Sequence, residues 1–152
     1  MIKTIGLVAH DNRKQDLIEW VEYNFKKLKD KKLVCTGTTG RLVKEALEKY
    51  LGPEEFLEKM TLLKSGPLGG DQQLGAMIAE GKIDLLIFLW DPMQPQPHDV
   101  DVKALLRIAV MYNVPTANNR STADFLITSS LYKSDYKPLL KDYSFYIKRE
   151  LL

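Results

Sequence analysis

The chain has 152 residues, a length that predicts one domain with a substantial core. Its composition, 45% hydrophobic and 28% charged, is that of a globular protein and excludes a disordered or repetitive chain. Lys and Arg number 22 against 20 acidic residues, so the net charge of +2 gives no general affinity for nucleic acid or for an anionic membrane.

Two further features limit the class of protein. The single cysteine, Cys35, excludes an internal disulfide and argues against a thiolate-bound metal cluster. The longest purely apolar run, Leu85 to Trp90, is far shorter than the ~20 residues of a membrane-spanning helix. The first residues also lack the pattern of a secretion signal. We therefore expect a cytoplasmic protein with one domain over residues 1–152.

Two strand–helix units come first in the chain. Ile5 to Ala9 is an apolar run typical of a buried strand, and residues 17–28 carry apolar side chains one turn apart, which predicts a helix. Leu33 to Cys35 predicts the second strand. The apolar pattern from Leu42 to Tyr50 predicts the second helix, which should end near Gly52.

The middle of the chain adds a third unit. Residues 53–56 are expected to open a short extra helix, because proline is favoured at the first helical position. Residues 61–63 predict a third strand. The helix that follows carries Leu74, Met77 and Ile78, and Gly81 suits its C-terminal cap.

The last predicted elements surround the most apolar segment of the chain. Leu85 to Trp90 is apolar on both faces, as a central parallel strand should be. A helix with Leu105, Leu106 and Ala109 follows, and then a short fifth strand, Val114 to Ala117. Residues 122–127 predict another helix, and residues 141–152 fit a strand or a helix equally well.

This alternation predicts an α/β fold with three layers, in which a mostly parallel five-stranded sheet is flanked by helices, as in Rossmann-like domains. In such folds ligands bind beyond the carboxyl ends of the strands, where the strand order reverses. Polar residues do follow each of the first four strands: His10, Asp11 and Lys14; Thr36 to Gly40; Ser65 to Asp71; and Asp91, His98, Asp99 and Asp101.

The segment Thr36-Gly37-Thr38-Thr39-Gly40 is read as a loop that suits a phosphate or a carboxylate. Glycine lets the backbone approach a ligand closely, and free amides at a helix N-terminus attract an anion. An ordinary helix cap with turn glycines explains the same residues, because threonine favours that position. The segment is not a Walker loop and lacks the dinucleotide spacing, which argues against ATP and NAD.

Asp71 has two interpretations. Near the start of a helix, an aspartate is most often a cap. The alternative is a general base, whose pKa would be raised above the reference of ~3.9 by loss of water and by a nearby phosphate. Ser65 and Gly66 precede it and offer further hydrogen-bond donors.

The two histidines also leave alternatives open. His98 lies in a proline-rich segment and is either held in place for chemistry or an ordinary surface residue, with Asp99 or Asp101 capping the next helix. A metal site formed by His10 and His98 with Asp11 or Asp101 matches no known ligand spacing. We therefore expect no metal.

Taken together, these segments resemble the methylglyoxal synthase family. The most specific match is Gly66-Pro67-Leu68-Gly69-Gly70-Asp71-Gln72-Gln73. Further matches, which together cover most of residues 3–127, are Val8-Ala9-His10-Asp11 with Lys14, Thr36 to Gly40, Trp90-Asp91-Pro92, Pro97-His98-Asp99, Asp101 to Arg107, Ala117-Asn118 and Thr122 to Phe125.

The resemblance implies a lyase that converts dihydroxyacetone phosphate to methylglyoxal and inorganic phosphate, without metal or organic cofactor. It also implies a homo-oligomer, usually a hexamer, that phosphate inhibits. Asp71 is implied as the proton-abstracting base, with His98 and Asp101 in the catalytic group. The substrate-binding residues it implies are His10, Lys14, Thr36, Gly37, Thr38, Thr39, Ser65, Gly66 and His98.

Two other functions compete with this one. A regulatory domain of the same fold would bind a phosphorylated small molecule without chemistry, but such a domain has no need to assemble Asp71 with His98 and Asp101. A receiver-like signalling domain would need an acidic pair after the first strand, where this chain has His10 and Asp11.

Overall fold

The computed structural model describes residues 1–52 and 58–148. Their centre is a five-stranded sheet with the strand order β3-β2-β1-β4-β5, in which every pairing is parallel. The strands are β1 (Thr4–Ala9), β2 (Lys32–Thr36), β3 (Met60–Leu63), β4 (Leu85–Leu89) and β5 (Thr116–Ala117). The predicted three-layer α/β fold is therefore confirmed.

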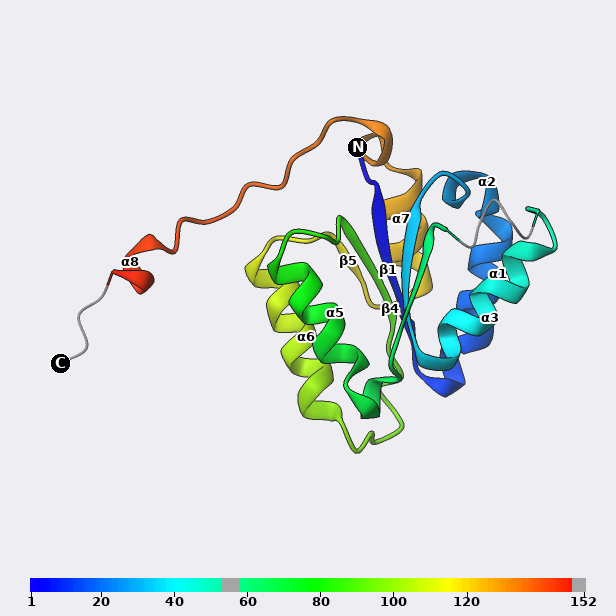
Figure 1. Cartoon of the computed structure of the whole chain (residues 1–152), viewed down its shortest axis with the longest axis horizontal. Coiled ribbons are helices and arrows are strands. Elements are labelled where there is room, and N and C mark those ends of the chain that lie inside the picture. Colours follow the sequence, from blue (N-terminus) through cyan, green and yellow to red (C-terminus); the bar gives the residue numbers. More distant parts are fainter. Residues whose placement is uncertain (53–57, 149–152) are drawn as a thin grey trace.

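Helices cover both faces of this sheet (Figure 1). On one face lie α1 (Lys14–Tyr23), α3 (Gly37–Glu48) and α7 (Arg120–Thr128), with the single turn α2 (Phe25–Leu28) at the end of α1. On the other face lie α5 (Gly70–Ala79) and α6 (Asp99–Met111). After Ser134 the chain stays in contact with the body as far as Leu139, whose carbonyl accepts from the side-chain amide of Asn113 at 3.0 Å, and further on it carries the short α8 (Ser144–Ile147).

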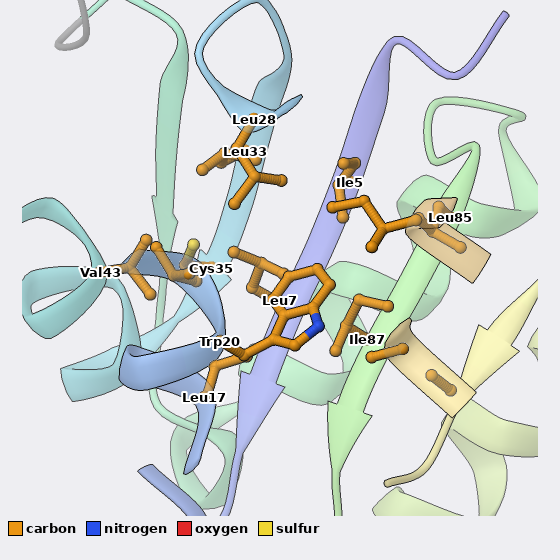
Figure 2. Close-up of a cluster of buried hydrophobic side chains, with 14 of the residues drawn as sticks. Ile5, Leu7, Leu17, Trp20, Leu28, Leu33, Cys35, Val43, Leu85 and Ile87 are labelled. Atoms are coloured by element: carbon orange, nitrogen blue, oxygen red, sulfur yellow. The ribbon is translucent and has the colours of Figure 1, made fainter. Parts of the chain in front are cut away.

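Two hydrophobic clusters hold the layers together, one on each face of the sheet. Leu7 of β1 is fully buried among the side chains of α1 and the neighbouring strands, beside Trp20 (Figure 2). On the other face, Phe88 of β4 packs with Leu74 of α5 and Val102 of α6. All five residues of β4 are buried, which confirms the prediction of a central strand.

Several predicted elements differ in their bounds. The helix expected over 17–28 is interrupted at Asn24, whose side-chain amide donates to the carbonyl of Trp20 at 2.9 Å and so competes with helix continuation. The fifth strand is shorter than Val114 to Ala117. The helix expected over 122–127 is present as α7, and Gly81 adopts the left-handed backbone (φ +68°) expected after α5.

Two further predicted segments remain, one in the middle of the chain and one at its C-terminal end. The short helix expected at 53–56 lies outside the described residues. In the segment 141–152, the structure describes residues as far as 148, and these form no strand but contain the four-residue α8. Within the described ranges, no helix combines the length and the hydropathy needed to cross a membrane.

Candidate active site

A cavity of about 350 Å³ lies at the carboxyl end of the sheet. Its walls come from the segments that follow β1, β2, β3 and β4, so four separate stretches of the sequence meet there. All but one of the predicted site residues line this cavity, namely His10, Lys14, Thr36, Gly37, Thr38, Thr39, Ser65, Gly66, Asp71 and His98. Asp11 and Gln96 also line it. No sequence feature marked Gln96, which lies between two prolines.

The centre of the cavity is a carboxylate beside an imidazole. Oδ2 of Asp71 lies 3.4 Å from Nε2 of His98, and both residues are more than nine-tenths buried. This oxygen has no hydrogen-bond partner among the described residues. Burial raises the pKa of Asp71, an effect that the neighbouring His98 opposes and the charge of Asp101 reinforces. A carboxylate in this state is a stronger base than an exposed one.

Asp71 does not cap its helix. Gly69, with a φ of +101°, occupies the cap position of α5, and Asp71 is the second residue inside the helix, with no capping hydrogen bond. The predicted alternative of an N-cap is therefore wrong. The same holds for Asp99 and Asp101, which lie within the first turn of α6 after the cap position of His98.

Asp101 is the one predicted catalytic residue that does not line the cavity. It lies on α6 beside a shallower hollow between α5 and α6, which Asp71 also borders. Its influence on the site is electrostatic, because its negative charge raises the pKa of Asp71. Asp101 therefore acts on the base without lining the cavity itself.

His10 is held as a neutral imidazole with one defined tautomer. The backbone N–H of Asp91 donates to Nδ1 of His10 at 3.2 Å, so Nδ1 is unprotonated and Nε2 carries the hydrogen. Burial, reinforced by the neighbouring His98, lowers the pKa of His10 and favours the neutral form. Nε2 is buried and has no partner in the described part of the chain, which leaves it free to donate to a ligand.

The cavity lining also includes a cation. Nζ of Lys14 donates to Oγ1 of Thr38 at 2.5 Å and pairs with the carboxylate of Asp11. Hydrogen bonding to Lys14 lowers the pKa of Asp11, so this carboxylate is ionised. The hydroxyl of Thr39, by contrast, lies 3.4 Å from the carbonyl of Ala9 and donates to it, which ties α3 to β1.

The Thr/Gly segment is the first turn of α3 rather than a separate loop. Thr36 holds the cap position in extended backbone, and the helix begins at Gly37, whose φ is +45°. A Cβ on Gly37 would lie 2.8 Å from Cα of Ser65, so glycine allows the segments after β2 and β3 to touch. The first three residues of this helix, Gly37, Thr38 and Thr39, line the cavity, and free amides at a helix N-terminus favour an anion.

Gly66 likewise allows a close approach, here between side chains of the cavity. A Cβ at this position would lie 2.8 Å from Nε2 of His98 and 3.0 Å from Oδ2 of Asp71. The hydrogen of glycine therefore leaves the carboxylate and the imidazole adjacent. In the described ranges, no group of three His, Cys, Asp or Glu side chains is arranged to hold a metal ion.

Comparison with known proteins assigns this arrangement to a class. Residues 16–118 match the family model described as the MGS-like domain, a match that covers more than half of the chain. The chain is 55% identical to the methylglyoxal synthase of Maridesulfovibrio salexigens, over 99% of this chain and 98% of that protein. It is 54% identical to the methylglyoxal synthase of Leptospira interrogans, over 98% and 95%.

A solved structure gives the same result. The crystal structure of methylglyoxal synthase from Elizabethkingia anophelis superimposes with a TM-score of 0.85 at 47% identity, over 99% of this chain and 93% of that one. The chain belongs to the methylglyoxal synthase family.

Proposed function

We propose that this protein is a lyase that converts dihydroxyacetone phosphate to methylglyoxal and inorganic phosphate. The observation that carries the proposal is the buried carboxylate of Asp71 beside His98, in a cavity that Lys14 and the start of α3 also line. A base and anion-binding groups in one cavity match a substrate with an acidic C–H next to a carbonyl and a phosphate on the adjacent carbon.

The reaction begins with removal of a carbon-bound proton by Asp71, which gives an enediolate. General base catalysis of this kind contributes typically about 10²–10⁴-fold. His98 and Nε2 of His10 donate hydrogen bonds to the two oxygens that acquire charge, and donors fixed before the reaction stabilise that charge most effectively. His98 also moves a proton between these oxygens.

The second step is loss of phosphate. The electron pair of the enediolate expels it when the C–O bond to phosphate is perpendicular to the enediolate plane. We assign the holding of this geometry to Lys14, Thr38, Ser65 and the amides at the start of α3, with Thr36, Gly37, Thr39 and Gly66 shaping the same wall. The bond breaks with its electrons on phosphate, and the remaining enol takes up a proton to become methylglyoxal.

Asp71→Asn tests this assignment. The amide keeps the shape of the side chain and cannot accept the proton, so methylglyoxal formation should fall by at least about 10²-fold. Phosphate binding should remain. Asp30→Asn, an exposed carboxylate in a hollow away from the cavity, is the matched control and should leave turnover unchanged. Normal turnover in Asp71→Asn would refute the role of Asp71.

The same assay separates the enzyme from a regulatory domain. Purified protein is mixed with dihydroxyacetone phosphate, and methylglyoxal and released phosphate are both measured. Equal amounts of the two products support the lyase. Saturable binding without release of phosphate would instead support a domain that only senses a phosphorylated small molecule.

We also propose that the chain acts as a homo-oligomer, expected to be a hexamer, with phosphate as product and inhibitor. Support comes from the segment after Ser134, where apolar side chains of α8 and the residues before it are exposed, including Leu139, Phe145 and Ile147. Exposed apolar groups of this density favour association. Light scattering should give six times the 17.4 kDa of one chain, and a monomer mass would refute the proposal.

A further inference from the structure

One side chain joins two of the segments that form the cavity. Asn12 lies in the 3₁₀ turn after β1 (Asp11–Arg13), and its Nδ2 donates to Oδ2 of Asp91 at 2.9 Å and to Oε1 of Gln94 at 2.9 Å. Both acceptors belong to the segment after β4. Both hydrogens of the Asn12 amide are thereby used. Asn12 is exposed, so it contributes nothing to the core.

The segment that Asn12 contacts supplies two walls of the site. It runs from Asp91 to His98, contains three prolines and forms no strand or helix. Gln96 and His98 line the cavity, and the backbone of Asp91 fixes the tautomer of His10. The position of this segment therefore decides where three of the polar groups of the cavity lie.

Few other contacts hold the segment. Asp91 is anchored locally, since its Oδ1 accepts from the backbone N–H of Met93 at 3.0 Å. Among the described residues, two hydrogen bonds join residues 92–97 to parts of the chain outside the segment 91–98: the bond from Asn12 to Gln94, and the bond from the backbone N–H of Asp99, at the start of α6, to the carbonyl of Gln96 at 3.2 Å. The bond from Asn12 is the one of these two that reaches a part of the chain far away in the sequence. The hydrogen bond from Asn12 also lowers the pKa of Asp91, which keeps the acceptor ionised and the bond charge-assisted.

We propose that Asn12 is a positioning residue that holds the segment 91–98 over the cavity before substrate binds. This inference rests on the proposed function, because it assigns Asn12 a part in binding the substrate of that reaction. Without Asn12 the segment would populate positions in which Gln96 and His98 are displaced. The apparent affinity for substrate would then fall in proportion to the fraction of molecules whose segment still occupies the binding position.

The size of the effect follows from the bond that is lost. A hydrogen bond to a charged group corresponds to about a factor of ten or more in an equilibrium constant. We therefore expect the KM for dihydroxyacetone phosphate to rise about tenfold when the amide donor is removed. Because bound substrate restores the segment, kcat should stay within about threefold.

The test uses Asn12→Asp, which keeps the shape and replaces the donor with an oxygen that faces the carboxylate of Asp91. The double variant Asn12→Asp with Asp91→Asn exchanges donor and acceptor and should recover much of the KM. The matched control is Gln15→Glu, one turn further along α1, which makes the same amide-to-carboxylate change beside Glu19. Its KM should equal that of the unmodified protein.

Hydrogen–deuterium exchange at the backbone amides of Met93, Gln94 and Gln96 in the ligand-free protein gives a readout that needs no turnover. Exchange should be faster in Asn12→Asp than in the unmodified chain. In the double variant, Asn12→Asp with Asp91→Asn, it should be slower than in Asn12→Asp alone. Unchanged exchange in Asn12→Asp would refute the proposal that Asn12 holds this segment in place. Faster exchange with an unchanged KM would refute its part in substrate binding, whereas an unmodified protein that forms no methylglyoxal would refute the proposed function itself.

Discussion

Gly66→Ala tests the geometry at the centre of the site. The added Cβ would lie 2.8 Å from Nε2 of His98 and 3.0 Å from Oδ2 of Asp71, where ordinary contact begins at 3.4 Å. The imidazole must therefore retreat by about 0.6 Å and the carboxylate by about 0.4 Å. A misplacement of 1 Å costs about 10²-fold in rate, so kcat should fall about tenfold to a hundredfold.

The control for this variant is Gly75→Ala on α5. A Cβ there would meet the side chain of Leu105 at 3.9 Å, which is an ordinary contact, and alanine favours a helix interior by roughly 0.5–1 kcal/mol over glycine. Gly75→Ala should therefore raise the thermal midpoint without changing kcat. The measurements are steady-state kinetics and thermal unfolding of both variants. A Gly66→Ala protein with unchanged kcat would refute the proposed contact of Asp71 with His98.

Four other predictions concern the same site and the core beneath it. Because only ionised Asp71 accepts a proton, kcat/KM should fall with decreasing pH through the raised pKa of this carboxyl, and a profile flat down to pH ~4 would contradict the burial argument. Burial favours the protonated form of Asp71, so the stability that this form contributes is lost as pH rises through the raised pKa. At pH 7 the thermal midpoint of Asp71→Asn should therefore be higher than that of the unmodified protein. Lys14→Met removes the cation beside Thr38 and should weaken inhibition by phosphate about tenfold or more, as measured by the inhibition constant. Leu7→Ala leaves a cavity at a fully buried position and should lower the free energy of unfolding by about 2–5 kcal/mol, as measured with urea. A smaller decrease would contradict the burial of Leu7 in the core shown in Figure 2.

The sheet was predictable because its strands have a simple physical signature. β4 is buried on both faces, so its sequence, Leu85 to Leu89, contains only apolar residues. The same reasoning placed the polar segments at one edge, because strands that run in parallel end on the same side. The structure confirms that His10 and His98 meet at this edge: they are 88 positions apart in the chain, and their ring centroids lie 5.9 Å apart.

Other features required side-chain geometry that sequence does not contain. The break at Asn24 depends on whether its amide bonds to the Trp20 carbonyl or to water. The position of Asp101 depends on the rotation of α6, and one residue of helical phase changes which face is directed at the cavity. Asn12 has no distinctive neighbours in the sequence, and its two acceptors lie 79 and 82 positions away.

The cavity is lined by several segments that lie far apart in the sequence. Its lining begins at Val8 and ends at His98, and the sheet must align four strands before the lining exists. A fragment that lacks one of these four strands would therefore bind no ligand, and a local opening of one strand would release a bound one. Phosphate should accordingly protect the whole domain against heat in one cooperative transition, by an amount that grows with the logarithm of its concentration.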